Sequence, residues 1–190
     1  FAHTPGLKIV YPSTPYDAKG LMKSAIRDNN PVLFFEHKFL YRRVKDEIPA
    51  EDYTVPLGKA TVRREGSDVT IATYAAMTHT ALDAAAELAK EGIEAEVLDL
   101  RTIMPLDTES ILGSVRKTNR LLVVHEDTRF GGLAGEISAV VFEKAFEDLD
   151  APVRRVTALD TPVPYSPPLE ERFLPQAKDV VTAARELAHY

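Results

Sequence analysis

The stretch Leu121-Leu122-Val123-Val124 decides the fold, because it is an unbroken apolar run of strand length. A strand that is apolar on both sides is typical of the centre of a parallel sheet that helices cover on both faces. From Asp68 onward the sequence alternates between strand-like and helix-like periodicity, which is the order expected for such a sheet. We therefore predict an α/β protein with a doubly wound, mainly parallel sheet.

Other elements of this sheet follow from local signals. Strands are predicted at residues 69–74, 95–100 and 153–156. Thr80 and Asp83 resemble a capping box that starts a helix ending at Gly92, and Asp107 caps the next helix. A third helix is expected after Gly131-Gly132, and a C-terminal helix has a 3.6-residue period of Ala177, Val180, Val181, Ala184 and Leu187.

The first fifty residues form a separate piece. We expect strands at residues 7–11 and 32–35 and, between them, a helix that starts at Thr14-Pro15 and ends at Asn29-Asn30-Pro31. The predicted buried stripe of this helix is Ala18, Leu21, Met22, Ala25 and Ile26. Two strands and one helix are too few for a domain, so the piece should complete a sheet whose other strands lie outside the chain. Residues 44–56 are predicted to be a linker, which divides the chain into residues 1–56 and 57–190.

Composition excludes several classes of protein. The chain has 190 residues, a net charge of −6 and no cysteine. The acidic balance argues against a nucleic-acid or anionic-membrane surface, and no apolar run approaches the ~20 residues of a membrane span. The absence of cysteine excludes disulfides and thiolate metal sites and is compatible with the reducing cytoplasm, where we expect the protein. Because the sequence starts without Met and without a signal peptide, we expect a fragment.

The histidines and glycines offer two candidate sites. No two of the five histidines have the i, i+4 spacing of metal ligands on a helix, so a histidine-based zinc site is not predicted. His125 is placed at the carboxyl end of the most buried strand, where ligands bind in open sheets, but a hydrogen-bonded structural histidine is the favoured interpretation. Residues 131–135 contain G-G-x-x-G, for which close helix packing is favoured over a phosphate cradle.

Two surface segments also allow two interpretations each. The prolines around Tyr165 (Pro162, Pro164, Pro167 and Pro168) suggest a stiff crossover, with a proline-motif ligand as the alternative. The acidic run from Glu143 to Asp150 is read as a solvated helix end, although it could receive a basic partner.

Several motifs resemble a known family. Residues 1–42, FAHTPGLKIVYPSTPYDAKGLMKSAIRDNNPVLFFEHKFLYR, resemble the end of the pyrimidine-binding domain in the beta subunit of thiamine-diphosphate-dependent 2-oxo acid dehydrogenases. The motifs DVTIATY, AEVLDLRTIMPLD, SVRKTNRLLVVHED, GGLAGEIS and DTPVPY within residues 68–190 are similar to the transketolase C-terminal domain of the same subunit. The resemblance covers essentially the whole chain and leans toward branched-chain members of the family.

The resemblance implies an enzyme and its cofactors. Such enzymes decarboxylate a 2-oxo acid on thiamine diphosphate, held with magnesium and shared with the alpha subunit, and pass the acyl group to a lipoyl arm. The family's active-site histidine corresponds to His3 in Ala2-His3-Thr4-Pro5-Gly6. The family's cofactor-activating Glu has no counterpart in these residues, so the chain alone should be inactive.

The resemblance also implies an ion and partners. A potassium ion would be held at Ala25, Ile26, Asp28 and Asn30, and Asp150 and Tyr190 would contact the basic binding domain of the lipoyl transacylase core. Two alpha and two beta subunits would assemble together.

Three alternatives remain open. The substrate could be pyruvate or acetoin, and the chain could come from a transketolase or a deoxyxylulose-phosphate synthase. It could also be a non-catalytic, doubly wound interaction domain without a cofactor.

Overall fold

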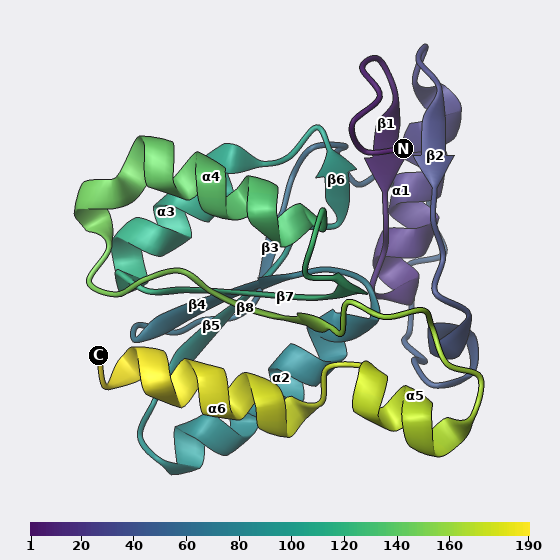
Figure 1. Ribbon diagram of the computed structural model, residues 1–190. Coiled ribbons are helices and arrows are strands. Elements are labelled where there is room, and N and C mark those ends of the chain that lie inside the picture. The colour runs from purple at the N-terminus through teal and green to yellow at the C-terminus, as the bar shows by residue number, and fades with distance from the viewer.

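The computed structural model describes residues 1–190 and contains two sheets (Figure 1). The larger sheet has the strand order β3 (Thr61–Arg64), β5 (Ala95–Asp99), β4 (Val69–Thr73), β7 (Leu121–Thr128) and β8 (Arg154–Ala158). Strand β3 runs antiparallel to β5, and all other neighbours are parallel. The predicted doubly wound, mainly parallel fold is confirmed.

Helices cover both faces of the larger sheet. Helices α3 (Thr108–Thr118) and α4 (Leu133–Ala145) lie on one face, and α2 (Ala76–Lys90) and α6 (Ala177–Ala188) lie on the other (Figure 1). The side chains of strand β7 alternate between the two hydrophobic cores. Leu121 and Val123 pack under α3 and α4, whereas Leu122 and Val124 pack under α2 and α6. This alternation explains the unbroken apolar run, since every position of the run faces a helix layer.

The smaller sheet joins distant parts of the chain. Its order is β2 (Val32–Phe34), β1 (Lys8–Val10) and β6 (Thr102–Met104), with β1 parallel to β2 and antiparallel to β6. Together with α1 (Pro15–Arg27) it stands at one side of the larger sheet in Figure 1. The N-terminal piece therefore gains a strand from later in this same chain, which the sequence did not indicate.

Helix starts were predicted where a side chain caps them. The Thr14 hydroxyl accepts from the Asp17 N–H at the start of α1, and the Asp107 carboxylate accepts from the Ser110 N–H at the start of α3. The predicted start of α2 at Thr80 is wrong, because the helix begins at Ala76 behind Ala75, which has a φ of 52° and no side-chain cap. The abrupt turn from β4 into α2 thus lacks the polar signal that marks most helix starts.

Two further expectations are corrected. Pro167 and Pro168 do not continue an extended crossover but open helix α5 (Pro167–Phe173), as proline at the first helical positions allows. The stripe predicted for α1 is wrong at Met22 and Ile26, which are exposed, because the buried face of this helix is made by Asp17, Gly20 and Leu21.

Hydrogen bonds and ring stacking hold part of the predicted linker against α1. Residues 49–56, here called the strap, have no helix or strand, but Lys19 donates to the Glu51 carbonyl at 3.1 Å and Ser24 donates to the Val55 carbonyl at 2.5 Å. The rings of Tyr16 and Tyr53 stack with centroids 4.5 Å apart. Short 3₁₀ turns, η1 (Lys38–Arg42) and η2 (Phe146–Asp148), complete the fold, and none of its helices has the length and apolarity needed to cross a membrane.

Candidate functional site

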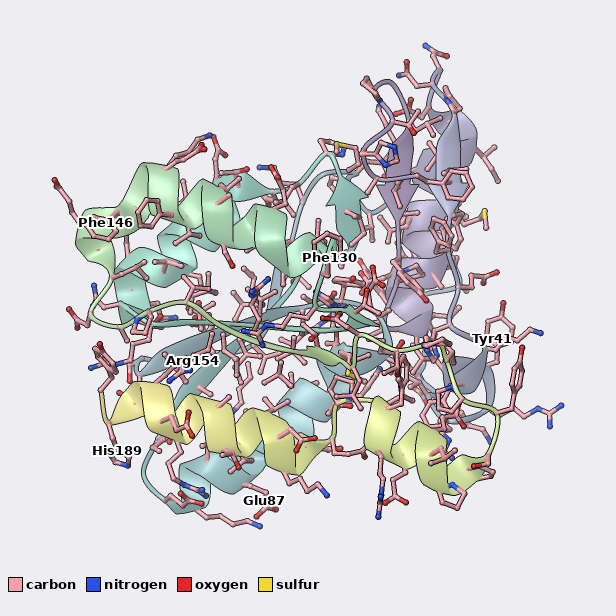
Figure 2. All side chains as sticks on the ribbon, viewed as in Figure 1. Tyr41, Glu87, Phe130, Phe146, Arg154 and His189 are labelled. Atoms are coloured by element: carbon pink, nitrogen blue, oxygen red, sulfur yellow. The ribbon has the colours of Figure 1, made fainter.

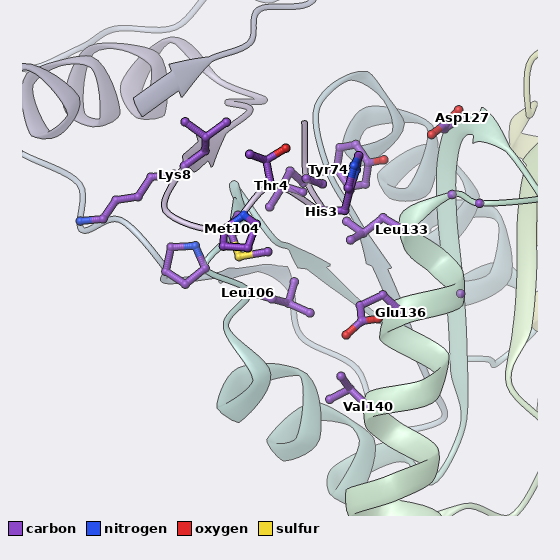
Figure 3. A pocket seen from close by; sticks show the side chains of 18 of the residues that line it. His3, Thr4, Lys8, Tyr74, Met104, Leu106, Asp127, Leu133, Glu136 and Val140 are labelled. Atoms are coloured by element: carbon purple, nitrogen blue, oxygen red, sulfur yellow. The ribbon is translucent and has the colours of Figure 1, made fainter. Parts of the chain in front are cut away.

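A cavity of 1410 Å³ lies between the N-terminal loop and the larger sheet (Figure 3). Its walls are residues 2–8, residues 103–106 at the end of β6 and just after it, the loop after β7, the start of α4, and Arg155 of β8. In open α/β sheets, ligands bind beyond the carboxyl ends of the strands, and the loop after β7 lies at that edge. The cavity is therefore the candidate active site.

His3 lies in the wall of this cavity, together with Tyr74, Leu133 and Glu136 (Figure 3). Residues 1–7 make only two backbone hydrogen bonds, from the Thr4 N–H to the Phe1 carbonyl and from the Leu7 N–H to the Thr4 carbonyl. Both hydrogen bonds join residues of the same loop, so the position of the His3 imidazole depends on packing. The structure brings His3 to a cavity, and its catalytic role stays a prediction.

His125 lies within its strand rather than at the end, because β7 continues to Thr128, and its ring packs against Tyr74, which lines the cavity. Its ring is fully buried, and Nε2 accepts from the Ala134 N–H at 3.2 Å, which satisfies an otherwise free donor at the start of α4. Burial lowers the pKa of His125, so the ring stays neutral and keeps this acceptor. The structural interpretation of His125 fits this arrangement.

The glycine motif serves the same packing. A Cβ at Gly132 would lie 2.7 Å from Cε1 of His125, which real contacts do not allow, so only glycine lets α4 start over the ring. Gly135 has open space around it. The predicted close helix packing is thus confirmed at Gly132, and the prediction is wrong for Gly135.

Sequence reasoning missed an ion pair between His37 and Glu126. His37, just before η1, lies with Nε2 at 2.8 Å from Oε2 of Glu126 in β7. The hydrogen bond to Glu126 raises the pKa of His37, and its ring stacks on Tyr11 with centroids 6.5 Å apart. No periodicity could reveal this pair, because its members are far apart in the sequence and meet only in the folded chain.

A second missed cluster fixes the N-terminal part to the larger sheet. Asp17 in α1 and Asp99 at the end of β5 are fully buried, and Arg63 of β3 donates to both. Ser13 donates to Asp99, and Arg101 donates to Asp17 at 3.0 Å. Burial raises the pKa of Asp99, while the Arg63 charge opposes that rise. The cluster fills the carboxyl edge of β5, which leaves the β7 end of that edge for the cavity.

The chain offers no side-chain set for magnesium. No three His, Cys, Asp or Glu side chains converge in positions that could hold a metal ion. These residues by themselves therefore do not fit a magnesium ion, whereas the cavity wall presents one imidazole, His3, among charged, polar and apolar residues.

The predicted potassium ligands gather at the end of α1. The Asp28 N–H donates to the Ala25 carbonyl at 3.4 Å, and the Asn30 N–H donates to Oδ1 of Asp28 at 2.8 Å. Lys8 donates to the same carboxylate and, as the largest cause, lowers the pKa of Asp28 to about 2. The Ile26 side chain points outward and is exposed. A positive side chain thus already lies beside the carboxylate of the predicted cation site.

The predicted docking residues line one hollow. Asp150 and Tyr190 border a hollow of 640 Å³ together with Phe142 and Phe146, whose rings pack edge to face 4.9 Å apart. Phe146 and His189 lie on the same side of the molecule in Figure 2. The structure therefore brings Asp150 and the chain terminus together at one mainly apolar hollow.

Comparison with known proteins assigns both parts of the chain. Residues 58–180 match the family "Transketolase, C-terminal domain", and residues 1–44 match "Transketolase, pyrimidine binding domain". The 2-oxoisovalerate dehydrogenase subunit beta of Bacillus subtilis (strain 168) is 52% identical over 191 residues, which cover 100% of this chain and 58% of that protein. The pyruvate dehydrogenase E1 component subunit beta of the same organism is 52% identical over 189 residues, with the same 100% and 58% coverage.

A third relative and two solved structures agree. The acetoin:2,6-dichlorophenolindophenol oxidoreductase subunit beta of Bacillus subtilis (strain 168) is 51% identical over 187 residues, which cover 98% of this chain and 54% of that protein. A split-gene transketolase solved as an inactive beta4 tetramer has a TM-score of 0.81 at 28% identity and covers 99% of this chain and 59% of its own. A transketolase from Pichia stipitis, with a TM-score of 0.67 and 16% identity over 100% of this chain and 26% of its own, shares the fold.

The chain spans 58% of the length of the first two relatives. Their identities to it are equal, so overall similarity does not separate their substrates. The predicted resemblance is confirmed: the chain belongs to the transketolase C-terminal domain family, and over its whole length it is similar to beta subunits of 2-oxo acid dehydrogenases.

Proposed function

We propose that this chain forms one wall of the active site of a thiamine-diphosphate-dependent 2-oxo acid dehydrogenase, with His3 as its proton-transfer residue. The observation that carries the proposal is the cavity, which places His3 opposite residues of the transketolase C-terminal domain. Thiamine diphosphate supplies the carbanion chemistry when bound, and a positioned imidazole supplies proton transfer.

The proposed enzyme is a cytoplasmic assembly of two alpha and two beta subunits. Thiamine diphosphate and its magnesium ion are proposed to be shared with the alpha subunit. The division into residues 1–56, from the pyrimidine-binding domain, and 57–190, the C-terminal domain, belongs to the same proposal. The 190 residues alone are proposed to be inactive.

Branched-chain 2-oxo acids are the proposed substrates. Supporting features are the motifs HED at 125–127, FFEHK at 34–38 and DTPVPYSP at 160–167, which resemble branched-chain members. We expect the assembled full-length enzyme to show a higher kcat/KM for 2-oxoisovalerate than for pyruvate in an assay of lipoyl-domain acylation. A higher value for pyruvate would exclude the branched-chain assignment, and no turnover of either acid would favour a non-catalytic role.

A potassium ion is proposed at the end of α1, held by oxygens of Ala25, Ile26, Asp28 and Asn30. Free carbonyls at a helix C-terminus carry the negative end of the helix dipole, which favours a cation. We expect a higher thermal midpoint of the assembly in potassium chloride than in tetramethylammonium chloride at equal ionic strength. Equal thermal midpoints in the two salts would contradict the potassium site and would mean that Lys8 alone neutralises the C-terminal end of α1.

The hollow at Asp150 and Tyr190 is proposed to receive the basic binding domain of the lipoyl transacylase core. Charge attraction accelerates encounter, so added salt should lower the association rate. A variant with Asp150→Ala and Tyr190 deleted should bind more weakly in surface-plasmon measurements. Asp83→Ala removes one exposed acidic charge on α2 and is the matched control; full binding by the hollow variant would exclude this surface.

A further inference from the structure

Tyr74 connects the two parts of the chain at the candidate active site. It follows β4 directly, at the turn that the strained Ala75 creates. Its ring packs on the buried His125 ring at a centroid distance of 6.2 Å and on the Tyr11 ring of the N-terminal part at 5.9 Å. The side chain is therefore fixed from both sides.

The same side chain separates two cavities. The 1410 Å³ cavity contains His3, and a smaller one of 390 Å³ lies beside it, lined by Tyr11 and Phe35. Tyr74 and Ala2, the neighbour of His3, line both. Ile103 and Asp127 also line both cavities, so Tyr74 and the loop that carries His3 form part of the partition between them.

Within residues 1–190, the loop that carries His3 is held by packing rather than by hydrogen bonds. Residues 1–7 make no hydrogen bond to any other part of the chain, and no side-chain hydrogen bond or ion pair involves them. The one aromatic contact of the loop, Phe1 on Phe35 at 6.3 Å, continues through Tyr11 to Tyr74. Packing along this aromatic row thus links Tyr74 to Phe1, in the loop that carries His3.

From this geometry we infer that Tyr74 is a positioning residue, whose ring sets the location of His3 in the active-site cavity. The inference rests on the proposed function of His3. Burial and the nearby Asp127 carboxylate raise the pKa of Tyr74, so the ring remains uncharged at every pH at which the enzyme would be assayed. The contribution comes from the flat ring rather than from a hydroxyl contact, because the hydroxyl forms no hydrogen bond within the chain.

The test uses full-length beta subunit in the assembled enzyme and follows lipoyl-domain acylation. Tyr74→Leu should lower kcat by roughly 10- to 100-fold with little change in KM, since displacement of a reacting group by about 1 Å can cost 10²-fold. Tyr74→Phe keeps the ring and should retain most of kcat. Tyr165→Leu, at a fully exposed tyrosine, is the matched control.

A double variant separates positioning from an independent role. If Tyr74 acts through His3, the His3→Ala, Tyr74→Leu variant is no slower than His3→Ala alone. A further loss of more than threefold in the double variant, or an equal loss in Tyr74→Phe, would overturn the positioning role while leaving the proposed function intact. Full activity of His3→Ala would instead overturn the proposed role of His3 itself.

A spectroscopic measurement makes the test independent of activity. Removing the Tyr74 ring should shift the NMR signal of the His3 imidazole through the lost ring current and the altered loop position, whereas Tyr165→Leu should leave it unchanged. An identical His3 signal in Tyr74→Leu would overturn the inference even if kcat falls.

Discussion

Lipoyl-domain acylation by the assembled full-length enzyme is expected to fall at least 10²-fold when His3 is replaced by alanine. Loss of a positioned general acid or base typically costs ~10²- to 10⁴-fold in rate. His3 lines the 1410 Å³ cavity and has no structural hydrogen bond to lose, so assembly and cofactor binding should persist. The rate is measured with a free lipoyl domain, and assembly by light scattering.

His189→Ala is the matched control for His3, because His189 lies at the exposed end of the chain, away from the cavity. It should leave the rate with a free lipoyl domain unchanged. Unchanged acylation by His3→Ala would remove His3 from the mechanism. Measurable decarboxylation by the 190-residue chain alone would show that no further residues or subunits are required.

Replacing Arg63 by alanine is expected to lower the free energy of unfolding of the chain by about 3–5 kcal/mol. The substitution leaves Asp17 and Asp99, both fully buried, without their shared partner, and removal of one member of a buried ion pair typically costs this amount. Urea unfolding followed by circular dichroism measures the change.

Two variants control the Arg63 result. Arg154→Ala removes a half-exposed arginine that pairs with Glu186 at 3.7 Å, and a surface pair of this kind contributes at most about 1 kcal/mol. Adding Asp17→Asn and Asp99→Asn to Arg63→Ala neutralises the buried charges and should recover part of the loss. A loss below about 1 kcal/mol in Arg63→Ala would mean that water compensates the two carboxylates.

Local signals predicted the elements whose causes are local. The apolar run of β7 and the caps Thr14 and Asp107 are set by neighbouring residues, and each was found in its predicted place. Strands β3 and β6, which pair antiparallel with distant segments, were missed. Helix α2 begins before its predicted start, because the backbone geometry of Ala75, rather than a capping side chain, begins it.

The candidate site was predictable only through resemblance. His3 was identified from a motif, and no periodicity in the sequence points to it. The Arg63 cluster joins α1, β3 and β5, and the His37–Glu126 pair joins η1 and β7. Such pairs depend on the tertiary arrangement, which single-sequence patterns do not encode. Tyr74 was included in a predicted strand, and its position between two cavities became visible only with the fold.

The pairing of β1 with β6 limits where the chain can be cut. The two matched families meet between residues 44 and 58, yet β6 at Thr102–Met104 depends on a strand from before that point. A truncated protein beginning after Pro56 would leave the backbone groups of β6 unpaired at an open strand edge. Open edges are templates for pairing between copies, so such a protein would aggregate through β6 unless another strand took the place of β1.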